Sequence, residues 1–272
     1  FRHYEAHIEH VYTDNSGMSP EALEESIAKM KKQGKKIKFL YLVPNFANPS
    51  GVTLSADRRP KILEICKREH ILILEDNPYG LLYFDKPVPD ALRASDEDGV
   101  IYLGSFSKIL APGFRVGYVL APPAIRDKLV LAQESALLCP SSFTQFMISE
   151  YLAHADWQKQ IDTFRGVYRE RKDAALSAVR EYLPNVETTT PDGGFYLWLT
   201  LPEGIDSKAM LPLAVKELVA YTPGTAFFGD GTGQRNLRIC YSYPTPENIK
   251  IGIKRLSNVI NLQTDLLQTF SK

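Results

Sequence analysis

The sequence has little of what marks a disulfide-stabilised, nucleic-acid-binding or membrane protein. It carries three cysteines, Cys66, Cys139 and Cys240, and its 32 basic side chains are balanced by 32 acidic ones. The odd, widely spaced cysteines indicate reduced thiols and therefore a cytoplasmic protein. Zero net charge removes the attraction that dominates nucleic-acid binding, so we expect no nucleic-acid partner. No apolar run approaches the roughly 20 residues that span a bilayer, so we expect no membrane partner either.

Histidine is also scarce. The five histidines show no metal-site spacing, and no cysteine group completes a metal shell, so we expect no metal. What remains is an ordinary globular composition, with 44% hydrophobic and 24% charged residues among 272. A chain of this length can form one large domain or two smaller ones around a sizeable core.

The first half of the chain alternates predicted helices with predicted strands. Helices are expected over 19–34, where Ser19-Pro20-Glu21 forms a cap, and over 55–69, with a kink or late start at Pro60. Apolar strands are expected at 37–43, 71–74, 100–103 and 117–120. Strands this apolar, separated by helices, predict an α/β sheet that is covered on both faces.

The pattern changes after Pro122. Residues 123–183 are predicted to be mostly helical, with a long amphipathic stretch over 157–182. A smaller mixed unit follows, with strands at 195–199 and 237–241, a helix over 207–218 and a last helix capped at 245–247. We therefore predict two domains, residues 1–145 and residues 146–272.

Four polar features follow the predicted strands of the first domain, at the place where open α/β sheets bind ligands. In chain order they are Asn48-Pro49-Ser50-Gly51, Asp76-Asn77-Pro78-Tyr79, Ser105-Phe106-Ser107-Lys108 and Arg115. Taken singly, each has an ordinary explanation as a turn, a helix cap or a solvated side chain. Arg238 differs, because a charge within an apolar strand must be paired or must bind an anion.

Taken together, these motifs resemble the class I/II aminotransferases, which are fold-type-I pyridoxal-phosphate enzymes. The order of the motifs matches that family, and a Gly-Gly-aromatic-x-x-Trp run at 193–198 and the late Arg238 extend the match into the second domain. Residues 75–79 and 194–198 look most like the branch of 2-aminoadipate, kynurenine and broad-specificity aminotransferases. The resemblance implies an α/β fold in which part of a large cofactor-binding domain, a mostly parallel sheet flanked by helices, precedes a smaller α+β domain.

The resemblance also assigns roles around the cofactor pyridoxal 5′-phosphate. Lys108 would form the Schiff base with the cofactor and later move the proton of the substrate Cα. Asp76 would face the pyridine nitrogen and keep it protonated, which deepens the electron sink. Tyr79 and Asn48 would hydrogen-bond the ring hydroxyl oxygen. Lys108, Asp76 and Tyr79 are thus the expected catalytic residues.

The same resemblance places the phosphate and the substrates. Ser105, Ser107 and Arg115 would hold the cofactor phosphate, since a planar guanidinium suits a bidentate contact. Arg238 would bind the α-carboxylate of the substrate, helped by the Asn48 amide. The substrates would be an amino acid and a 2-oxo acid.

The chain departs from the family in its length. Members are usually longer and dimeric, and nothing here matches their N-terminal arm, their first strands or the aromatic residue stacked on the cofactor. We therefore expect a C-terminal fragment with an unpaired sheet edge or gap and an incomplete site that binds the cofactor weakly or not at all and shows little turnover. The competing explanations are that the missing part comes from another chain or is merely omitted from the sequence. The full-length form is expected to be a homodimer. The resemblance also suggests a cis bond before Pro49.

Two other functions fit the same residues. The first is a different reaction on the same scaffold, such as that of a β-lyase, a decarboxylase-like enzyme or a cyclopropane-forming synthase, because the electron sink serves them all. The second is an aminotransferase-like effector domain of a transcription regulator whose DNA-binding part lies upstream. A purely structural role would not need Lys108, Asp76 and Arg238 together.

Overall fold

The structure is a computed structural model that describes residues 4–270 and divides them into two compact units. Unit 1 combines residues up to 10, Phe46–Val52 and the chain from Gly166 onward, and unit 2 combines Val11–Asn45 with Thr53–Arg165. The predicted domain boundary at 145/146 stays a prediction, and residues 1–3 and 271–272 of the predicted domains lie outside the described part.

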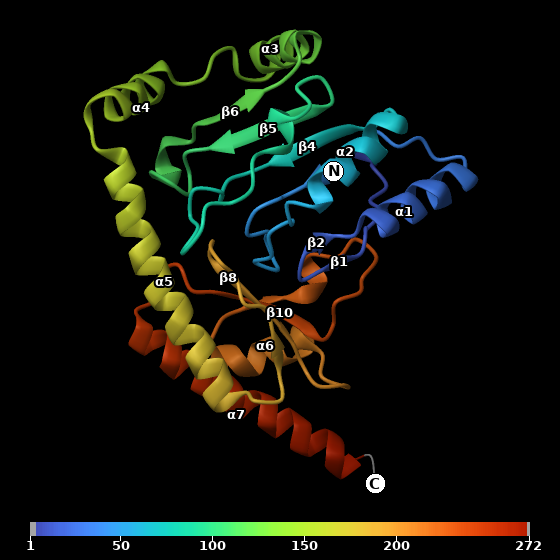
Figure 1. Cartoon of the computed structure of the whole chain (residues 1–272). Helices are drawn as coiled ribbons and strands as arrows, with labels where there is room; N and C mark the ends of the chain where they lie inside the picture. Colours follow the sequence, from blue (N-terminus) through green and yellow to red (C-terminus); the bar gives the residue numbers. More distant parts are fainter. Residues whose placement is uncertain (1–3, 271–272) are drawn as a thin grey trace. The chain divides into compact units, whose positions relative to one another are not determined.

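Within the described residues, unit 2 is built on a sheet of four strands in the order β3-β4-β5-β6 (Figure 1). The strands are β3 Phe39–Leu42, β4 Leu72–Asp76, β5 Val100–Ser105 and β6 Gly117–Leu120. The pairs β3–β4 and β4–β5 are parallel, whereas β5–β6 is antiparallel. The carboxyl ends of β3, β4 and β5 therefore lie at one edge of the sheet, and β6 starts from that same edge.

Two helices cover one face of this sheet. They are α1 Pro20–Lys32 and α2 Arg58–Arg68. The core between helices and sheet consists of side chains that are at most 9% exposed, among them Leu23, Ile27, Leu40, Leu42, Ile62, Ile65, Ile73 and Val100. The alternation in β3 explains the arrangement, because Leu40 and Leu42 are buried while Phe39 and Tyr41 between them point the other way.

The sequence predicts that both faces of this sheet are covered, but among the described residues part of the second face is exposed. On the second face Phe39 is 37% exposed, Tyr41 40% and Val119 45%. The remaining helices of the unit are α3 Pro123–Leu137, α4 Ser142–His154 and the start of α5 Trp157–Tyr182, up to Arg165. Among the described residues of α3 and α4, Ile148 is the buried one. An apolar strand indicates that both of its faces are covered, but the sequence of the strand does not show which segment covers each face.

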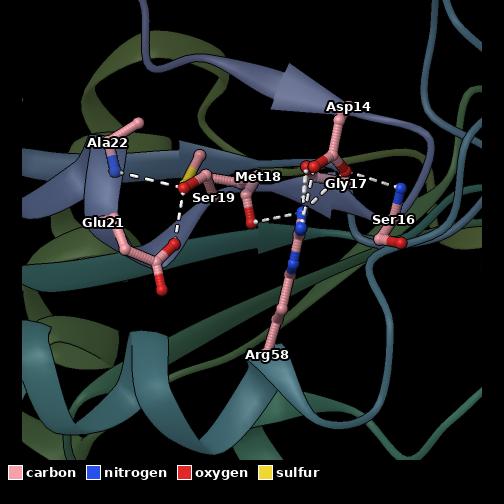
Figure 2. A network of polar contacts seen from close by, with 8 residues as sticks. All are labelled: Asp14, Ser16, Gly17, Met18, Ser19, Glu21, Ala22 and Arg58. Atoms are coloured by element: carbon pink, nitrogen blue, oxygen red, sulfur yellow. Dashed lines mark hydrogen bonds and ion pairs between the residues drawn. The ribbon is translucent and has the colours of Figure 1, made fainter.

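A polar network joins the start of α1 to the start of α2 (Figure 2). The network begins in a short hairpin, β1 Thr13–Asp14 and β2 Gly17–Met18. The Arg58 guanidinium donates to both oxygens of Asp14, at 2.7 and 2.8 Å, and to the carbonyl of Gly17 at 2.8 Å. Ser19 caps α1, because its hydroxyl oxygen accepts from the Ala22 amide at 3.2 Å as the sequence predicts. These contacts hold the hairpin against α2.

Unit 1 contains a second sheet of four strands among the described residues, in the order β7-β8-β10-β9. The strands are β7 Glu187–Thr188, β8 Tyr196–Thr200, β9 Thr222–Pro223 and β10 Asn236–Cys240, and all the pairs are antiparallel. Its helices are α6 Ser207–Lys216, α7 Pro246–Phe270 and the part of α5 Trp157–Tyr182 that follows the unit boundary. The interior includes the fully buried side chains of Leu197, Leu199, Leu237 and Leu256.

The fold class is α/β, as predicted, with a mixed sheet flanked by helices in unit 2 and an antiparallel sheet with helices in unit 1. The predicted helices and strands are confirmed to within a few residues at each end. The helix expected over 55–69 starts late, at Arg58, so that Pro60 lies in its first turn, where a missing amide proton is tolerated. No helix in the described part of the chain is long and apolar enough to cross a membrane.

Candidate active site

The carboxyl edge of the unit 2 sheet presents Asp76. The residue ends β4 opposite Leu103 of β5, and the next amide, of Asn77, donates to the Leu103 carbonyl at 3.0 Å. The Tyr41 hydroxyl donates to Asp76 Oδ2 at 2.6 Å. The pKa of Tyr41 is raised, first because its hydroxyl is partly desolvated and second because it donates to this carboxylate. Asp76 is thus held at the sheet edge by a donor from the neighbouring strand.

Lys108 and Arg115 lie in the loop that connects β5 to β6. Because Ser105 pairs with Gly117 across the two antiparallel strands, the loop leaves the sheet and returns to it at the edge that carries Asp76. Ser105 Oγ accepts from the Ser107 amide at 3.1 Å, which holds the first turn of the loop. Arg115 adopts a left-handed backbone, with φ of 55°, and is exposed. The loop therefore places hydroxyl, amine and guanidinium groups on one short segment.

Tyr79 follows Asp76 by three residues and is only 5% exposed. Its carbonyl accepts from the Leu82 amide at 2.7 Å, so the segment after β4 turns sharply. Tyr79 therefore belongs to unit 2, as do Asp76, Ser105 and Lys108.

A buried polar chain that the sequence analysis missed lies beneath this edge. Arg59 donates to Asn45 Oδ1 at 2.7 Å, the Asn45 amide donates to Asn77 Oδ1 at 2.9 Å, and Asn77 donates to the Tyr102 hydroxyl at 3.1 Å. Asn45 is fully buried. Burial lowers the pKa of Arg59 and raises that of Tyr102 to about 12. The sequence did not indicate that Arg59 and Asn45 are buried, because polar residues in a helix and a loop are usually exposed to solvent.

Glu75, next to Asp76, has a structural role. Its side chain is fully buried and its two oxygens accept from the amides of Leu92 and Arg93 at 3.0 Å each. Burial raises the pKa of Glu75, and the two amide donors partly offset this effect. The alternation of the strand separates the two acids, so that Glu75 faces the core and Asp76 the opposite side.

In unit 1, the turn that carries Asn48 packs against β8. The Asn48–Pro49 bond is cis, which confirms the prediction. Gly51 has a φ of 72°, and a Cβ there would lie 2.7 Å from the carbonyl oxygen of Tyr196. The turn is closed by the Gly51 amide, which donates to the Ala47 carbonyl at 2.6 Å. A glycine is therefore required both by the backbone angle and by the close approach to β8.

Arg238 on β10 meets Asn48 directly. Its Nη1 donates to Asn48 Oδ1 at 2.5 Å and its Nη2 to Thr222 Oγ1 at 3.2 Å. The guanidinium carbon lies 4.3 Å from the ring centre of Tyr196 and 5.1 Å from that of Phe227. Its Nε is buried and has no hydrogen-bond partner. Such a guanidinium is held in place and still has donor capacity, which is what an anion requires.

The structure thus forms two groups from the predicted site residues. Unit 2 brings Asp76, Tyr79, Ser105, Ser107, Lys108 and Arg115 to one sheet edge and its loops. Unit 1 joins Asn48 to Arg238. The sequence analysis missed Tyr41 and Thr222 as partners of these groups, because only the pairing of strands brings each of them to its partner.

Comparison with known proteins agrees with this geometry. Residues 1–256 match the family described as aminotransferase class I and II. Aromatic-amino-acid aminotransferase 1 of Thermococcus litoralis is 42% identical over 262 residues, which are 96% of this chain and 63% of that protein. An uncharacterized HTH-type transcriptional regulator of Bacillus subtilis is 32% identical over 217 residues, 79% of this chain and 44% of that protein.

A solved structure of an aminotransferase also matches this chain. The crystal structure of Pyrococcus horikoshii kynurenine aminotransferase superimposes with a TM-score of 0.90 at 42% identity, covering 93% of this chain and 63% of that one. The chain thus spans somewhat less than two thirds of the length of these aminotransferases. The resemblance inferred from the order of the motifs is confirmed. This chain belongs to the class I and II aminotransferase family.

Proposed function

We propose that this chain is part of an enzyme that transfers amino groups from amino acids to 2-oxo acids with pyridoxal 5′-phosphate as its cofactor. The observation that carries the proposal is the gathering of a carboxylate, an amine, two hydroxyls and a guanidinium at one sheet edge of unit 2. The kynurenine aminotransferase of Pyrococcus horikoshii was solved in complex with PMP, the aminated form of this cofactor.

The chemistry of these groups fits the cofactor. A protonated pyridine nitrogen needs an anion, and Asp76 supplies a carboxylate whose second oxygen is held by Tyr41. A phosphate needs several donors, and Ser105, Ser107 and Arg115 supply two hydroxyls and a guanidinium. Lys108 supplies the primary amine that a reactive aldehyde requires.

The proposed mechanism assigns one task to each group. When bound, pyridoxal phosphate supplies an electron sink that makes the Cα–H bond of an amino acid acidic. Asp76 holds the proton on the pyridine nitrogen, which strengthens that sink. Lys108 Nζ accepts the proton from Cα and is the expected general base. Tyr79, fixed by burial next to Asp76, is proposed to donate to the ring hydroxyl oxygen.

Arg238 and Asn48 are proposed to bind the α-carboxylate of the substrate. The Arg238 side chain is fixed by two hydrogen bonds and two aromatic rings. A carboxylate that satisfies the remaining donors of the guanidinium gains charge-assisted hydrogen bonds. This pair recognises a carboxylate and leaves the side chain of the amino acid unspecified.

A lysine variant tests the nucleophile. In the protein as its gene encodes it, borohydride reduction after addition of pyridoxal phosphate should leave the cofactor on the peptide that contains Lys108. Lys108→Ala should abolish this labelling and the reaction, whereas Lys128→Ala, an exposed lysine of α3, should change neither. A Lys108→Ala protein that still transaminates would overturn the assignment.

The reaction itself is tested with a panel of amino acids and 2-oxoglutarate. Formation of glutamate with the matching 2-oxo acid is the expected result. Absence of glutamate with every amino acid tested would favour a β-lyase or another reaction of the same cofactor.

A second candidate is the effector domain of a transcription regulator, and it is favoured by the similarity to the Bacillus subtilis regulator. Such a protein would bind the cofactor and an amino acid without turnover. The gene sequence decides between the two: a basic winged helix-turn-helix upstream of this chain supports the regulator, and an aminotransferase N-terminal region supports the enzyme.

We also infer a homodimer and a cytoplasmic location for the protein as its gene encodes it. The family resemblance supports the first. The second is supported by the described cysteines, Cys66, Cys139 and Cys240, which are all free thiols. The molecular mass in solution tests the dimer.

A further inference from the structure

The hydrogen bond between Tyr41 and Asp76 joins two neighbouring strands of unit 2. Tyr41 pairs with Leu74 in the parallel β3–β4 ladder, and Asp76 lies two residues further along β4 on the same face. A diagonal neighbour at this spacing is within reach of an aromatic side chain. The Oη–Oδ2 distance of 2.6 Å is typical of a hydroxyl that donates to a carboxylate.

We propose that Tyr41 is a positioning residue for the cofactor, because it holds Oδ2 of Asp76 and so directs Oδ1 toward the protonated pyridine nitrogen. The inference rests on the proposed function, in which Asp76 faces that nitrogen. Tyr41 lies outside every motif identified in the sequence.

The direction of the hydrogen bond follows from the environment of the phenol. Partial desolvation and the facing carboxylate raise the pKa of Tyr41, so the residue keeps its proton and remains a donor at neutral pH. An ionised carboxylate only accepts, so Tyr41 occupies one of its oxygens without competing for the other.

Loss of the Tyr41 hydroxyl should change Asp76 in two ways, and both should weaken binding of the cofactor. The carboxyl group would be free to rotate, and Oδ2 would lose its hydrogen-bond donor, so the carboxylate would draw the proton of a pyridine nitrogen further toward itself. A cofactor bound at this site would then keep less positive charge on its ring, be held less tightly and lower the proton affinity of a nitrogen bonded to it less than before.

The test is the variant Tyr41→Phe in the protein as its gene encodes it. The dissociation constant of pyridoxal phosphate should rise roughly 3- to 10-fold. The pH midpoint of the visible absorbance of the bound cofactor should move upward by roughly half a unit. An unchanged dissociation constant together with an unchanged midpoint would overturn the proposal.

A matched control separates positioning from stability. Tyr221 in unit 1 donates to the Ser207 carbonyl, also at 2.6 Å, so Tyr221→Phe removes an equivalent hydrogen bond. It should lower the denaturation midpoint but leave the absorbance midpoint in place. An equal shift of the absorbance midpoint in Tyr221→Phe would show that general destabilisation accounts for the Tyr41→Phe result.

Parallel variants separate this proposal from the proposed function. Asp76→Asn and Lys108→Ala should each disturb the absorbance of the bound cofactor more than Tyr41→Phe does. If both do so and Tyr41→Phe has no effect, only the role of Tyr41 fails. If neither does so, the proposed function fails as well.

Discussion

Arg238 donates to Asn48 at 2.5 Å although 190 positions separate the two residues in the sequence. The contact depends on a strand of the second sheet and on a turn from the first third of the chain, which both belong to unit 1. The turn lies against β8, and β8 pairs with β10, the strand of Arg238. The proposed carboxylate subsite is therefore complete within a single unit.

Replacement of Arg238 should weaken substrate binding selectively. In the protein as its gene encodes it, Arg238→Ala should reduce amino-acid affinity by roughly 2–5 kcal/mol, because the charged donor of the subsite is lost. Uptake of pyridoxal phosphate should stay nearly unchanged. Spectroscopic titrations with an amino acid and with the cofactor measure the two affinities.

Arg235 provides the control for this prediction. It precedes β10, and its Nε donates to the Leu201 carbonyl at 2.9 Å. Arg235→Ala removes the same charge and should leave amino-acid affinity unchanged. Equal affinities of wild type and Arg238→Ala would remove Arg238 from the site.

Gly51 is predicted to tolerate no side chain. Gly51→Ala adds a Cβ 2.7 Å from the Tyr196 carbonyl oxygen at a φ of 72°. The backbone strain and the steric overlap together should lower the free energy of unfolding by about 2–4 kcal/mol. Urea denaturation followed by circular dichroism measures the effect.

Gly34→Ala is the matched variant, since Gly34 also has a positive φ, of 67°, but nothing lies within 4 Å of the added Cβ. It should lower the free energy of unfolding by only about 1 kcal/mol. Equal losses in the two variants would show that the close approach to β8 contributes nothing.

The Asp14–Arg58 pair should make stability depend on acid pH (Figure 2). The hydrogen bonds from Arg58 lower the pKa of Asp14 below its ordinary value of 3.8. A carboxyl with a lowered pKa in the folded state stabilises the protein above the unfolded-state value, and this contribution is lost as the pH falls through the folded value. Because Asp14 is 37% exposed, solvent screening limits the contribution to no more than about 1 kcal/mol.

The variant Asp14→Asn tests the predicted direction of the pH dependence of stability. The free energy of unfolding should fall less between neutral pH and pH values below about 4 in the variant than in the wild type. Asp98→Asn, at an exposed position, should retain the wild-type pH dependence. A variant of Asp14 with the full wild-type dependence would contradict the prediction.

Local sequence was sufficient for most elements of the fold. Ser19 before Pro20 marked the start of α1, and the apolar run at 117–120 coincides with β6. The order of Asn48, Asp76, Lys108 and Arg238 was sufficient to identify the family. These features depend on neighbours in the chain, or on the spacing of residue types along it.

Partners from distant segments were decided only by the tertiary structure. Nothing near Tyr41 in the sequence indicates that its hydroxyl meets Asp76, 35 positions away, and nothing near Asn45 indicates burial between Arg59 and Asn77. The physical reason is that a hydrogen bond requires its two groups within about 3 Å of each other, and only the pairing of strands and the packing of helices bring distant residues that close. The sequence by itself determined the elements and the chemical groups, and the fold decided which of those groups hold one another in place.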